Sequence, residues 1–382
     1  MATRITCLCN RASQTVALDW LPASGMGGPS VLPFCHCDVC RRTTGLLCTS
    51  YIPLRQGKQS GPNLNGLVEY IESTTSSRWF CGTCGAHVFL QLKGNEEQGT
   101  KFMAARGTIE DSGPQTESIL HLCLATTVDG SIFGLAEPAG RVLQRGTELN
   151  TCFTGAPRSA PAYTRTSWTS EHLSNDAPRD SSNPIPSSIK TLAASCQCEG
   201  VKLFITTPNQ ASRSATSPWT DVLVPYHSST PHPDAAANPN DVKWWLCDNG
   251  TKYLAGLCAC NSCRLASGFP IQSWTFISRS NIFKTSDGSN LAYDDLGTLK
   301  QYKSSPGVFR EFCGVCGATV FWHSDERPGV VDVSVGLLRA ETGVRAEDWL
   351  HWELGRISFE EHAVDQGMIR CLKEDFGSVG PR

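Results

Sequence analysis

Cysteines in a pattern that occurs twice are the residues of this chain best suited to chemistry. Each copy has a C-x-C pair, then a C-x-C-x2-C triplet, then a C-x2-C pair, which makes seven thiols. Because seven is odd, disulfides cannot pair them all, and each set divides naturally into four and three. Four thiolates make a closed structural zinc site, and three leave a coordination position open.

The two pairs of each copy are predicted to form a four-cysteine zinc site. Such pairs share an ion only where the backbone turns sharply, and the glycines around the second pair supply that freedom. The binding free energy of the ion would count directly as folding free energy. The alternative is a set of thiols that bind no metal. The predicted ligands are Cys7, Cys9, Cys81 and Cys84 in the first copy, and Cys196, Cys198, Cys313 and Cys316 in the second.

The triplet of each copy is predicted to hold a catalytic zinc ion. Zn²⁺ with three thiolates carries a formal charge of about −1, so it acidifies a bound water less than a three-histidine site does. A thiol loses its proton far more easily than water. The chemistry therefore favours an exogenous thiol as fourth ligand over hydroxide-driven hydrolysis. The triplets are Cys35, Cys37 and Cys40, and Cys258, Cys260 and Cys263.

A side chain that closes the triplet site is the competing interpretation. His36 or a distant histidine would do this, although His36 lies between two ligands and the second copy has Ala259 there. Arginines follow the triplets and either bind a substrate carboxylate or face solvent; they are Arg41, Arg42 and Arg264. Thr44-Gly45 and Ser267-Gly268 are predicted to form tight turns beside the metal. The remaining thiols are interpreted as ordinary buried cysteines; they are Cys48, Cys123, Cys152, Cys247 and Cys371.

The elements that must position these cysteines are expected to be strands. Residues 201–205, 273–277 and 330–335 are short, rich in β-branched or aromatic residues and partly alternating. Helical signals are confined to 341–350 and 358–364. The sequence therefore predicts a mainly β fold.

The chain is predicted to contain two zinc domains, at 1–150 and 189–382, joined by a flexible linker at 151–188 that is rich in Ser, Thr and Pro. The second domain carries an insertion at about 208–250. Three tryptophans of the insertion either line a pocket for a larger substrate or pack the insertion against its domain; they are Trp219, Trp244 and Trp245.

Composition narrows the class of partner and the compartment. The 382 residues carry a formal net charge of −3 and no long basic run, which argues against nucleic acid or a membrane surface as the main partner. No apolar stretch approaches the roughly 18 residues of a transmembrane helix. The first cysteine pair follows the N-terminus almost at once, which leaves no room for a secretory signal. The 19 cysteines then predict a reducing, cytoplasmic location.

The order C-x-C, C-H-C-x2-C-R-x2-[ST]-G and F-C-x2-C-G resembles the glutathione-dependent formaldehyde-activating enzyme family, also named for centromere protein V. The resemblance implies two tandem β-tent domains, each with a structural zinc on the four cysteines and a catalytic zinc on the triplet, thus up to four ions per chain. It also implies condensation of glutathione with formaldehyde, a carbon–sulfur lyase activity. The chain departs from the pattern at Asn10 and Ala259, next to the ligands.

Three functional hypotheses follow. In the first, the protein is a zinc-dependent carbon–sulfur lyase-type enzyme that acts on adducts of a small thiol, glutathione, with an aldehyde. In the second, the same zinc site serves a lyase or hydrolase of a specialised metabolite. In the third, the protein is a zinc-scaffolded binding module without turnover. Two zinc ions per domain, one open to small thiols, would favour an enzyme.

Overall fold

The computed structural model describes residues 2–20, 31–55, 61–95, 99–110, 113–129, 131–132, 190–225, 236–285, 288–289 and 291–377. The predicted linker at 151–188 lies outside the described residues, as does the part of the insertion at 226–235. Below, the first copy denotes the described residues up to 132, and the second copy those from 190 onward.

Strands dominate both copies, which confirms the predicted mainly β fold. The first copy contains β1 (Ala2–Ile5), β2 (Gln14–Ala17), β3 (Val31–Cys35), β4 (Tyr51–Pro53), β5 (Leu67–Ile71), β6 (Ser76–Cys81), β7 (His87–Lys93), β8 (Thr100–Ala105) and β9 (Ser118–Leu122). The second contains β10 (Thr191–Ser195), β11 (Lys202–Thr206), β12 (Leu246–Cys247), β13 (Lys252–Cys258), β14 (Gln272–Ser278), β15 (Ile282–Phe283), β16 (Leu299–Ser305), β17 (Val308–Cys313), β18 (Thr319–Ser324), β19 (Val330–Ser334) and β20 (Leu350–Trp352). The three predicted strands coincide with β11, β14 and β19.

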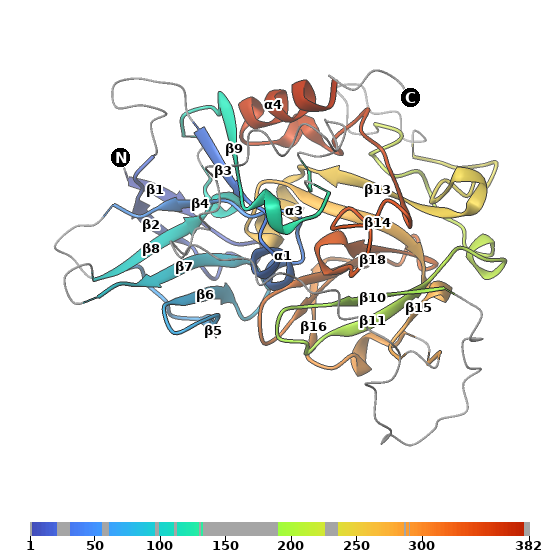
Figure 1. Ribbon diagram of the computed structural model, residues 1–382, viewed down its shortest axis with the longest axis horizontal. Coiled ribbons are helices and arrows are strands. Elements are labelled where there is room, and N and C mark those ends of the chain that lie inside the picture. Colours follow the sequence, from blue (N-terminus) through green and yellow to red (C-terminus); the bar gives the residue numbers. More distant parts are fainter. Residues whose placement is uncertain are drawn as a thin grey trace.

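The sheets of the two copies follow the same plan. The main sheet of the first copy has the order β4-β8-β7-β6-β5, and the second has β14-β19-β18-β17-β16 within a larger sheet. A parallel pair flanks each main sheet, β3 with β9 and β13 with β20. An antiparallel pair precedes each, β1 with β2 and β10 with β11. Figure 1 shows the first copy (blue to cyan) beside the second (green to red).

Helices are few among the described residues, and the three α-helices there all lie outside the two segments with predicted helical signals. α1 (Asp38–Thr44) and α3 (Asn261–Ser267) start inside the triplets, and α4 (Gln366–Gly377) follows the last strand. Residues 341–349 form turns, and 358–364 contains one 3-10 turn. The 3-10 turns are η1 (Arg106–Thr108), η2 (Leu124–Thr126), η5 (Ala211–Arg213), η6 (Asp248–Gly250), η7 (Arg279–Asn281), η8 (Tyr293–Asp295), η9 (Val335–Leu337) and η10 (Glu360–His362).

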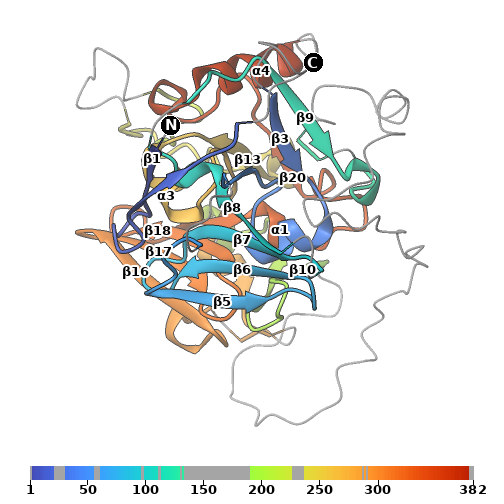
Figure 2. The same ribbon diagram turned by 90° about the vertical axis from the view of Figure 1, so that its left-hand side faces the viewer.

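α4 crosses from the second copy to the first. It packs against β9 (Figure 2), and the carboxylate of Asp365, just before the helix, forms a buried ion pair of 3.2 Å with Arg106. The Oγ1 hydroxyl of Thr116 donates a 2.6 Å hydrogen bond to the same carboxylate. None of the helices in the described part of the chain is both long and apolar enough to cross a membrane.

The interface between the copies has an approximate two-fold symmetry. The Leu8 N–H, in the first C-x-C pair, donates to the Leu265 carbonyl in α3 at 3.0 Å. Its counterpart, the Gln197 N–H in the second C-x-C pair, donates to the Arg42 carbonyl in α1 at 3.0 Å. Each four-cysteine loop is thereby bonded to the triplet helix of the other copy.

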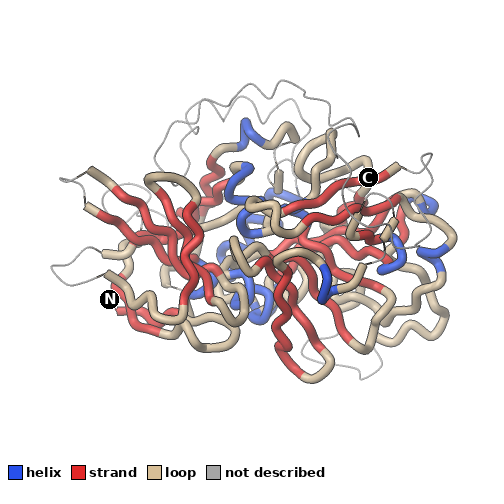
Figure 3. Tube along the Cα trace, turned by 90° about the horizontal axis from the view of Figure 1, so that it is seen from below, coloured by secondary structure: helices blue, strands red, loops and turns tan. Residues whose placement is uncertain are grey.

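A second symmetric pair of bonds joins the ends of these helices to the 3-10 turns. The Gly107 N–H donates to the Gly268 carbonyl at 2.8 Å, and the Gly336 N–H donates to the Gly45 carbonyl at 2.9 Å. Gly45 and Gly268 adopt left-handed φ angles of 82° and 86° and end α1 and α3, as the predicted tight turns require. Helices therefore lie between the two strand assemblies, as Figure 3 shows from below.

Gly268→Ala is expected to destabilise the protein by about 3 kcal/mol, because a Cβ there would lie 2.0 Å from the His87 carbonyl oxygen of the other copy. Left-handed backbone adds about 1–2 kcal/mol of this for any L-residue. Gly66→Ala is the matched control, since Gly66 has a φ of +78° but nothing within 4 Å of its added Cβ. Urea unfolding of both variants measures the difference, and equal costs would contradict this interface.

Candidate functional site

The structure brings together the four cysteines of each predicted structural site. In each cluster all four sulfurs lie within 4.8 Å of one another. Neighbouring sulfurs are 3.5 Å apart between Cys7 and Cys9, and 3.4 Å apart between Cys198 and Cys313. A tetrahedral zinc ion with Zn–S bonds of about 2.3 Å needs sulfurs about 3.8 Å apart. An all-sulfur donor set of this size fits Zn²⁺.

Local backbone geometry explains why the second pair of each cluster converges. The register of β6 with β7 shifts immediately before Cys81, and that of β17 with β18 shifts immediately before Cys313. Each strand then closes a tight turn, with the Gly85 and Gly317 N–H groups bonded to the Cys81 and Cys313 carbonyls at 2.9 Å. Hydrogen bonds from neighbouring thiols, Cys196 first, hold the pKa of Cys313 far below its usual value, so a thiolate is favoured there.

The triplets gather at the starts of the short helices. Cys37 is the N-cap of α1, where its sulfur accepts from the Cys40 N–H at 3.4 Å. Cys260 is the N-cap of α3, where its sulfur accepts from the Cys263 N–H at 3.2 Å. This cap bends the backbone so that the last two cysteines face the one that ends the preceding strand. All three sulfurs of each triplet lie within 4.8 Å of one another.

The second triplet opens into a cavity of about 470 Å³, here called the triplet cavity. Cys258, Cys260 and Cys263 line it, and Cys260 is half-buried. Aromatic side chains form much of the wall: Trp219, Trp244, Trp274, Phe276, Trp322 and Phe359. Arg310, Arg327 and Asp332 are among its charged residues.

The insertion forms one side of the triplet cavity. Its Asp221 carboxylate accepts from the Phe359 N–H at 2.6 Å and pairs with Arg356 at 3.0 Å, which fixes it to the segment after β20. Trp219 and Trp244 line the cavity, as one interpretation of the insertion held. Trp245 is fully buried and donates a hydrogen bond to the Ser212 carbonyl, so this side chain packs the insertion against its domain.

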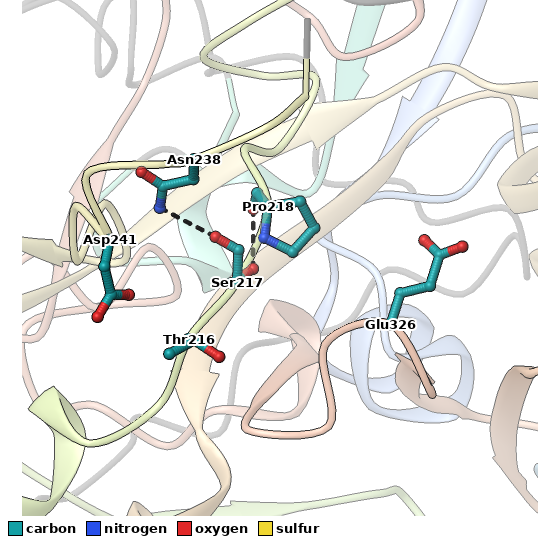
Figure 4. A pocket seen from close by; sticks show the side chains of 6 residues that line it. All are labelled: Thr216, Ser217, Pro218, Asn238, Asp241 and Glu326. Atoms are coloured by element: carbon teal, nitrogen blue, oxygen red, sulfur yellow. Dashed lines mark hydrogen bonds between the residues drawn. The ribbon is translucent and has the colours of Figure 1, made fainter. Parts of the chain in front are cut away.

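A second hollow of about 420 Å³ lies beside the triplet cavity, with which it shares Pro218 and Glu326 (Figure 4). The Asn238 side chain donates to the Ser217 carbonyl at 3.0 Å and joins two parts of the insertion there. Glu326, from the turn between β18 and β19, lies on the opposite side. The hollow contains none of the cluster cysteines.

The first triplet is enclosed. Cys35, Cys37 and Cys40 are at most 2% exposed. Arg78 Nη2 donates to the Cys40 sulfur at 3.1 Å, while its other contacts are the Tyr51 hydroxyl at 2.7 Å and the Glu72 carboxylate at 3.1 Å. The guanidinium beside Cys40 is therefore already neutralised by a buried carboxylate.

The pairing of strands in each sheet shows which residues of the second copy correspond to Arg78 and its carboxylate partner. Arg78 is opposite Tyr70, and Arg310 is opposite Tyr302, so the two arginines correspond. Two residues after these tyrosines, the first copy has Glu72 and the second has Ser304. Arg310 therefore has no counterpart of the carboxylate that pairs with Arg78. Arg310 Nη1 instead lies 3.7 Å from the Cys263 sulfur, at the wall of the triplet cavity.

Strand pairing also shows which residue of the first copy corresponds to Asp332, the carboxylate of the triplet cavity. Asp332 is opposite Trp322 in the second copy, and Trp322 corresponds to Leu90 of the first copy. Leu90 is opposite Met103, so Met103 takes the position of Asp332 in the first copy. Asp332 accepts a hydrogen bond from Arg327. Burial raises the pKa of Asp332 to about 6, in spite of the opposing effect of Arg327. A polar, titratable wall thus exists in the second copy where the first has apolar side chains.

A comparison with models of protein families shows to which family the chain belongs. The model of the glutathione-dependent formaldehyde-activating enzyme family matches residues 3–122 and 245–352, more than half of the chain. The chain belongs to this family. The resemblance seen in the cysteine pattern is thereby confirmed over two successive regions. No curated protein and no solved structure matched the chain.

The second match to the formaldehyde-activating enzyme family begins after Cys196 and Cys198. The structure nevertheless places both sulfurs in the second four-cysteine cluster. The insertion, which separates them from the matched region, therefore interrupts the family pattern in sequence but leaves the metal-binding geometry intact.

The arginines proposed to bind a substrate carboxylate have other partners. Arg41 pairs with Asp38 at 2.8 Å, and Arg42 donates to the Cys196 carbonyl at 3.3 Å. Arg264 donates to the Ile109 carbonyl at 3.1 Å across the interface. None of the three lines the triplet cavity, because the last turn of each helix points these side chains at the other copy or at the helix itself.

His36 does not close the first triplet. Its Nε2 lies 2.9 Å from Nδ1 of His121, and the two rings stack. Burial lowers the pKa of both imidazoles, that of His121 to about 4. Sequence reasoning missed Arg310 and Asp332; the shared Arg-x-Phe-Cys flank before each C-x2-C pair was a signal for the first, and nothing marked the second.

Proposed function

We propose that the second copy is a zinc-dependent enzyme of carbon–sulfur lyase type that makes and breaks adducts of a thiol, glutathione, with an aldehyde. The observation that carries the proposal is the open second triplet, which faces a cavity containing Arg310 and Asp332. Zn²⁺ held by these three cysteines would bind an exogenous thiol as its thiolate.

Arg310 and Asp332 supply the groups that this chemistry needs. The Arg310 guanidinium, beside Cys263, offsets the negative charge of the triplet and can also receive a substrate carboxylate. Asp332, with its raised pKa of about 6, exchanges a proton near neutral pH, as an acid–base group must.

The reaction balances without a further reagent. In adduct formation the thiol first gives its proton to solvent. Its sulfur then forms a bond to the aldehyde carbon, and the π electrons of the carbonyl move to its oxygen, which takes the proton of Asp332. Asp332 regains a proton from solvent, so the thiol proton is the one gained overall by the hydroxyl. In the reverse direction the Asp332 carboxylate takes the hydroxyl proton, the carbonyl forms again, and the carbon–sulfur bond breaks with its electron pair on sulfur.

The aromatic walls favour a carbonyl partner larger than formaldehyde. Six aromatic side chains line the cavity, and such walls suit a partner with apolar surface to bury, which formaldehyde lacks. This observation supports the second candidate, a lyase or hydrolase of a specialised aldehyde or thiol conjugate at the same site. The partners proposed are accordingly a small thiol and an aldehyde or a related metabolite.

A reducing, cytoplasmic location is part of the proposal. No disulfide joins any of the described cysteines. Thiolate clusters of this kind keep their metal-binding form where thiols stay reduced. Neither nucleic acid nor a membrane is proposed as a partner.

The pH profile of adduct exchange tests the proposal. The zinc-loaded protein is expected to accelerate exchange between glutathione and an aldehyde, measured by NMR line broadening with formaldehyde and with an aromatic aldehyde. Adduct formation should slow as pH rises through about 6, because Asp332 then loses the proton it donates. Asp332→Asn should remove this inflection and lower the rate by about 100-fold or more, as loss of a general acid does.

Asp295→Asn is the control, since Asp295 is an exposed carboxylate paired with Lys284 outside the cavity. It should keep the wild-type rate and profile. Absence of zinc-dependent acceleration with every aldehyde would overturn the enzymatic proposal in favour of a binding module. If Asp332→Asn still accelerates adduct exchange and its pH profile keeps the inflection near 6, Asp332 is not the acid that donates the proton.

A further inference from the structure

We propose that Cys123 is the fourth ligand of the first triplet, so that this triplet holds a closed four-thiolate zinc site with no position for a substrate. Cys123 lies outside both predicted four-cysteine sets and follows β9. Its sulfur is 4.0 Å from that of Cys35, and the two residues belong to one buried cluster with Cys37 and Cys40.

The register of the parallel strands shows that Cys123 takes the position of Phe359. Cys35 is opposite Leu122 in the pairing of β3 with β9, and Cys258 is opposite Ser358 in the second copy. The next residue adopts left-handed backbone in both copies, with φ of 60° at Cys123 and 53° at Phe359.

This unusual backbone directs the two side chains to equivalent places beside the triplets. Left-handed backbone is uncommon for residues other than glycine, so its presence at both positions reflects one shared local structure. In the second copy, the Phe359 ring forms part of the wall of the triplet cavity and leaves the three cysteines open to it. In the first copy, a thiol stands at that position.

Burial indicates what that thiol does. Cys123 and all three cysteines of the first triplet are at most 2% exposed. A zinc ion on three buried thiolates needs a fourth donor, and a protein thiol buried beside them can supply it. Zinc sites closed by four protein ligands are structural, whereas catalytic sites retain an open position.

The geometry requires only a small adjustment. Tetrahedral coordination with Zn–S bonds of about 2.3 Å needs sulfurs about 3.8 Å apart, and Cys123 lies 4.0 Å from Cys35. Cys123 is not within 4.8 Å of all three triplet sulfurs, so its side chain must turn toward the ion on binding. The 3.6 Å between the Cys35 and Cys40 sulfurs already suits coordination.

Zinc release to a chelating dye tests the proposal on the full, zinc-loaded chain. With four ions bound, the wild-type protein should release one rapidly, from the open second triplet, and three slowly. Cys123→Ser should release two rapidly, because it opens the first triplet. Cys48→Ser is the matched control, a buried thiol in the same copy outside the clusters, and should behave as the wild type.

Phe359→Cys is the reciprocal variant and keeps the test decisive if Cys123→Ser fails to fold. It places a fourth thiol at the second triplet and should convert the rapid ion to a slow one. The proposal is overturned if Cys123→Ser releases zinc as the wild type does, or if Phe359→Cys leaves the rapid ion unchanged. Recovery of a Cys35–Cys123 disulfide from the zinc-loaded protein, by mass spectrometry after alkylation of free thiols, would also overturn it.

Discussion

Cys260→Ser is expected to lower turnover of the thiol–aldehyde adduct by at least about 100-fold, whereas Cys37→Ser leaves it within about two-fold of the wild type. Cys260 and Cys37 hold the same position in their triplets, as the N-caps of α3 and α1. Cys260 faces the triplet cavity, while Cys37 is buried. Changing even a residue that only supports a metal ligand costs about 10–100-fold, so loss of a ligand should reach at least the upper value.

The comparison must be made per folded molecule, because Cys37→Ser removes a ligand of the enclosed first triplet. NMR exchange rates are therefore divided by the folded fraction, which circular dichroism measures at the same temperature. A loss of only about two-fold in each variant would show that both copies turn over substrate. A loss confined to Cys37→Ser would place the active site in the first copy, contrary to the geometry.

Cys313→Ser is expected to release one zinc ion and to lower the free energy of unfolding by more than about 5 kcal/mol. Cys313 ends β17, and its cluster joins this strand to the loop after β10 that contains Cys196 and Cys198. The binding free energy of a structural zinc ion is about 10 kcal/mol or more, comparable to the entire stability of many domains. Loss of this ion should therefore unfold the second copy.

Cys371→Ser controls for removal of a thiol, since Cys371 lies on α4 outside every cluster of the described residues. It should retain four ions and the wild-type unfolding midpoint. Zinc content by elemental analysis and urea unfolding by circular dichroism measure both quantities. A Cys313→Ser protein with full zinc content and unchanged midpoint would show that the cluster does not bind the metal.

The cysteine clusters were predictable because their ligands come in pairs and triplets close in sequence. Short spacing limits the geometry so strongly that the division into four and three follows almost from counting. The strands β11, β14 and β19 were predictable for a related reason, since β-branched and aromatic residues alternate within them. In both cases the signal lies within about seven neighbouring residues.

Features that depend on tertiary pairing were not predictable in this way. Asp332 reaches the cavity through the register of β18 with β19, and Cys123 meets Cys35 through the pairing of β3 with β9. α1 and α3 are too short for periodicity to show them. α4 did carry a signal, because Met368, Ile369, Leu372 and Phe376 recur at helical spacing and are all buried.

The approximate two-fold interface has a consequence for how the copies diverged. Matching bonds between each C-x-C loop and the opposite helix are what an isologous homodimer would show, and here a single polypeptide carries both partners. In a homodimer every substitution appears in both subunits, so neither pocket can change alone. Fusion removes this constraint: one half can give up its chemistry to serve as a permanent scaffold, while the other acquires an insertion and a larger pocket.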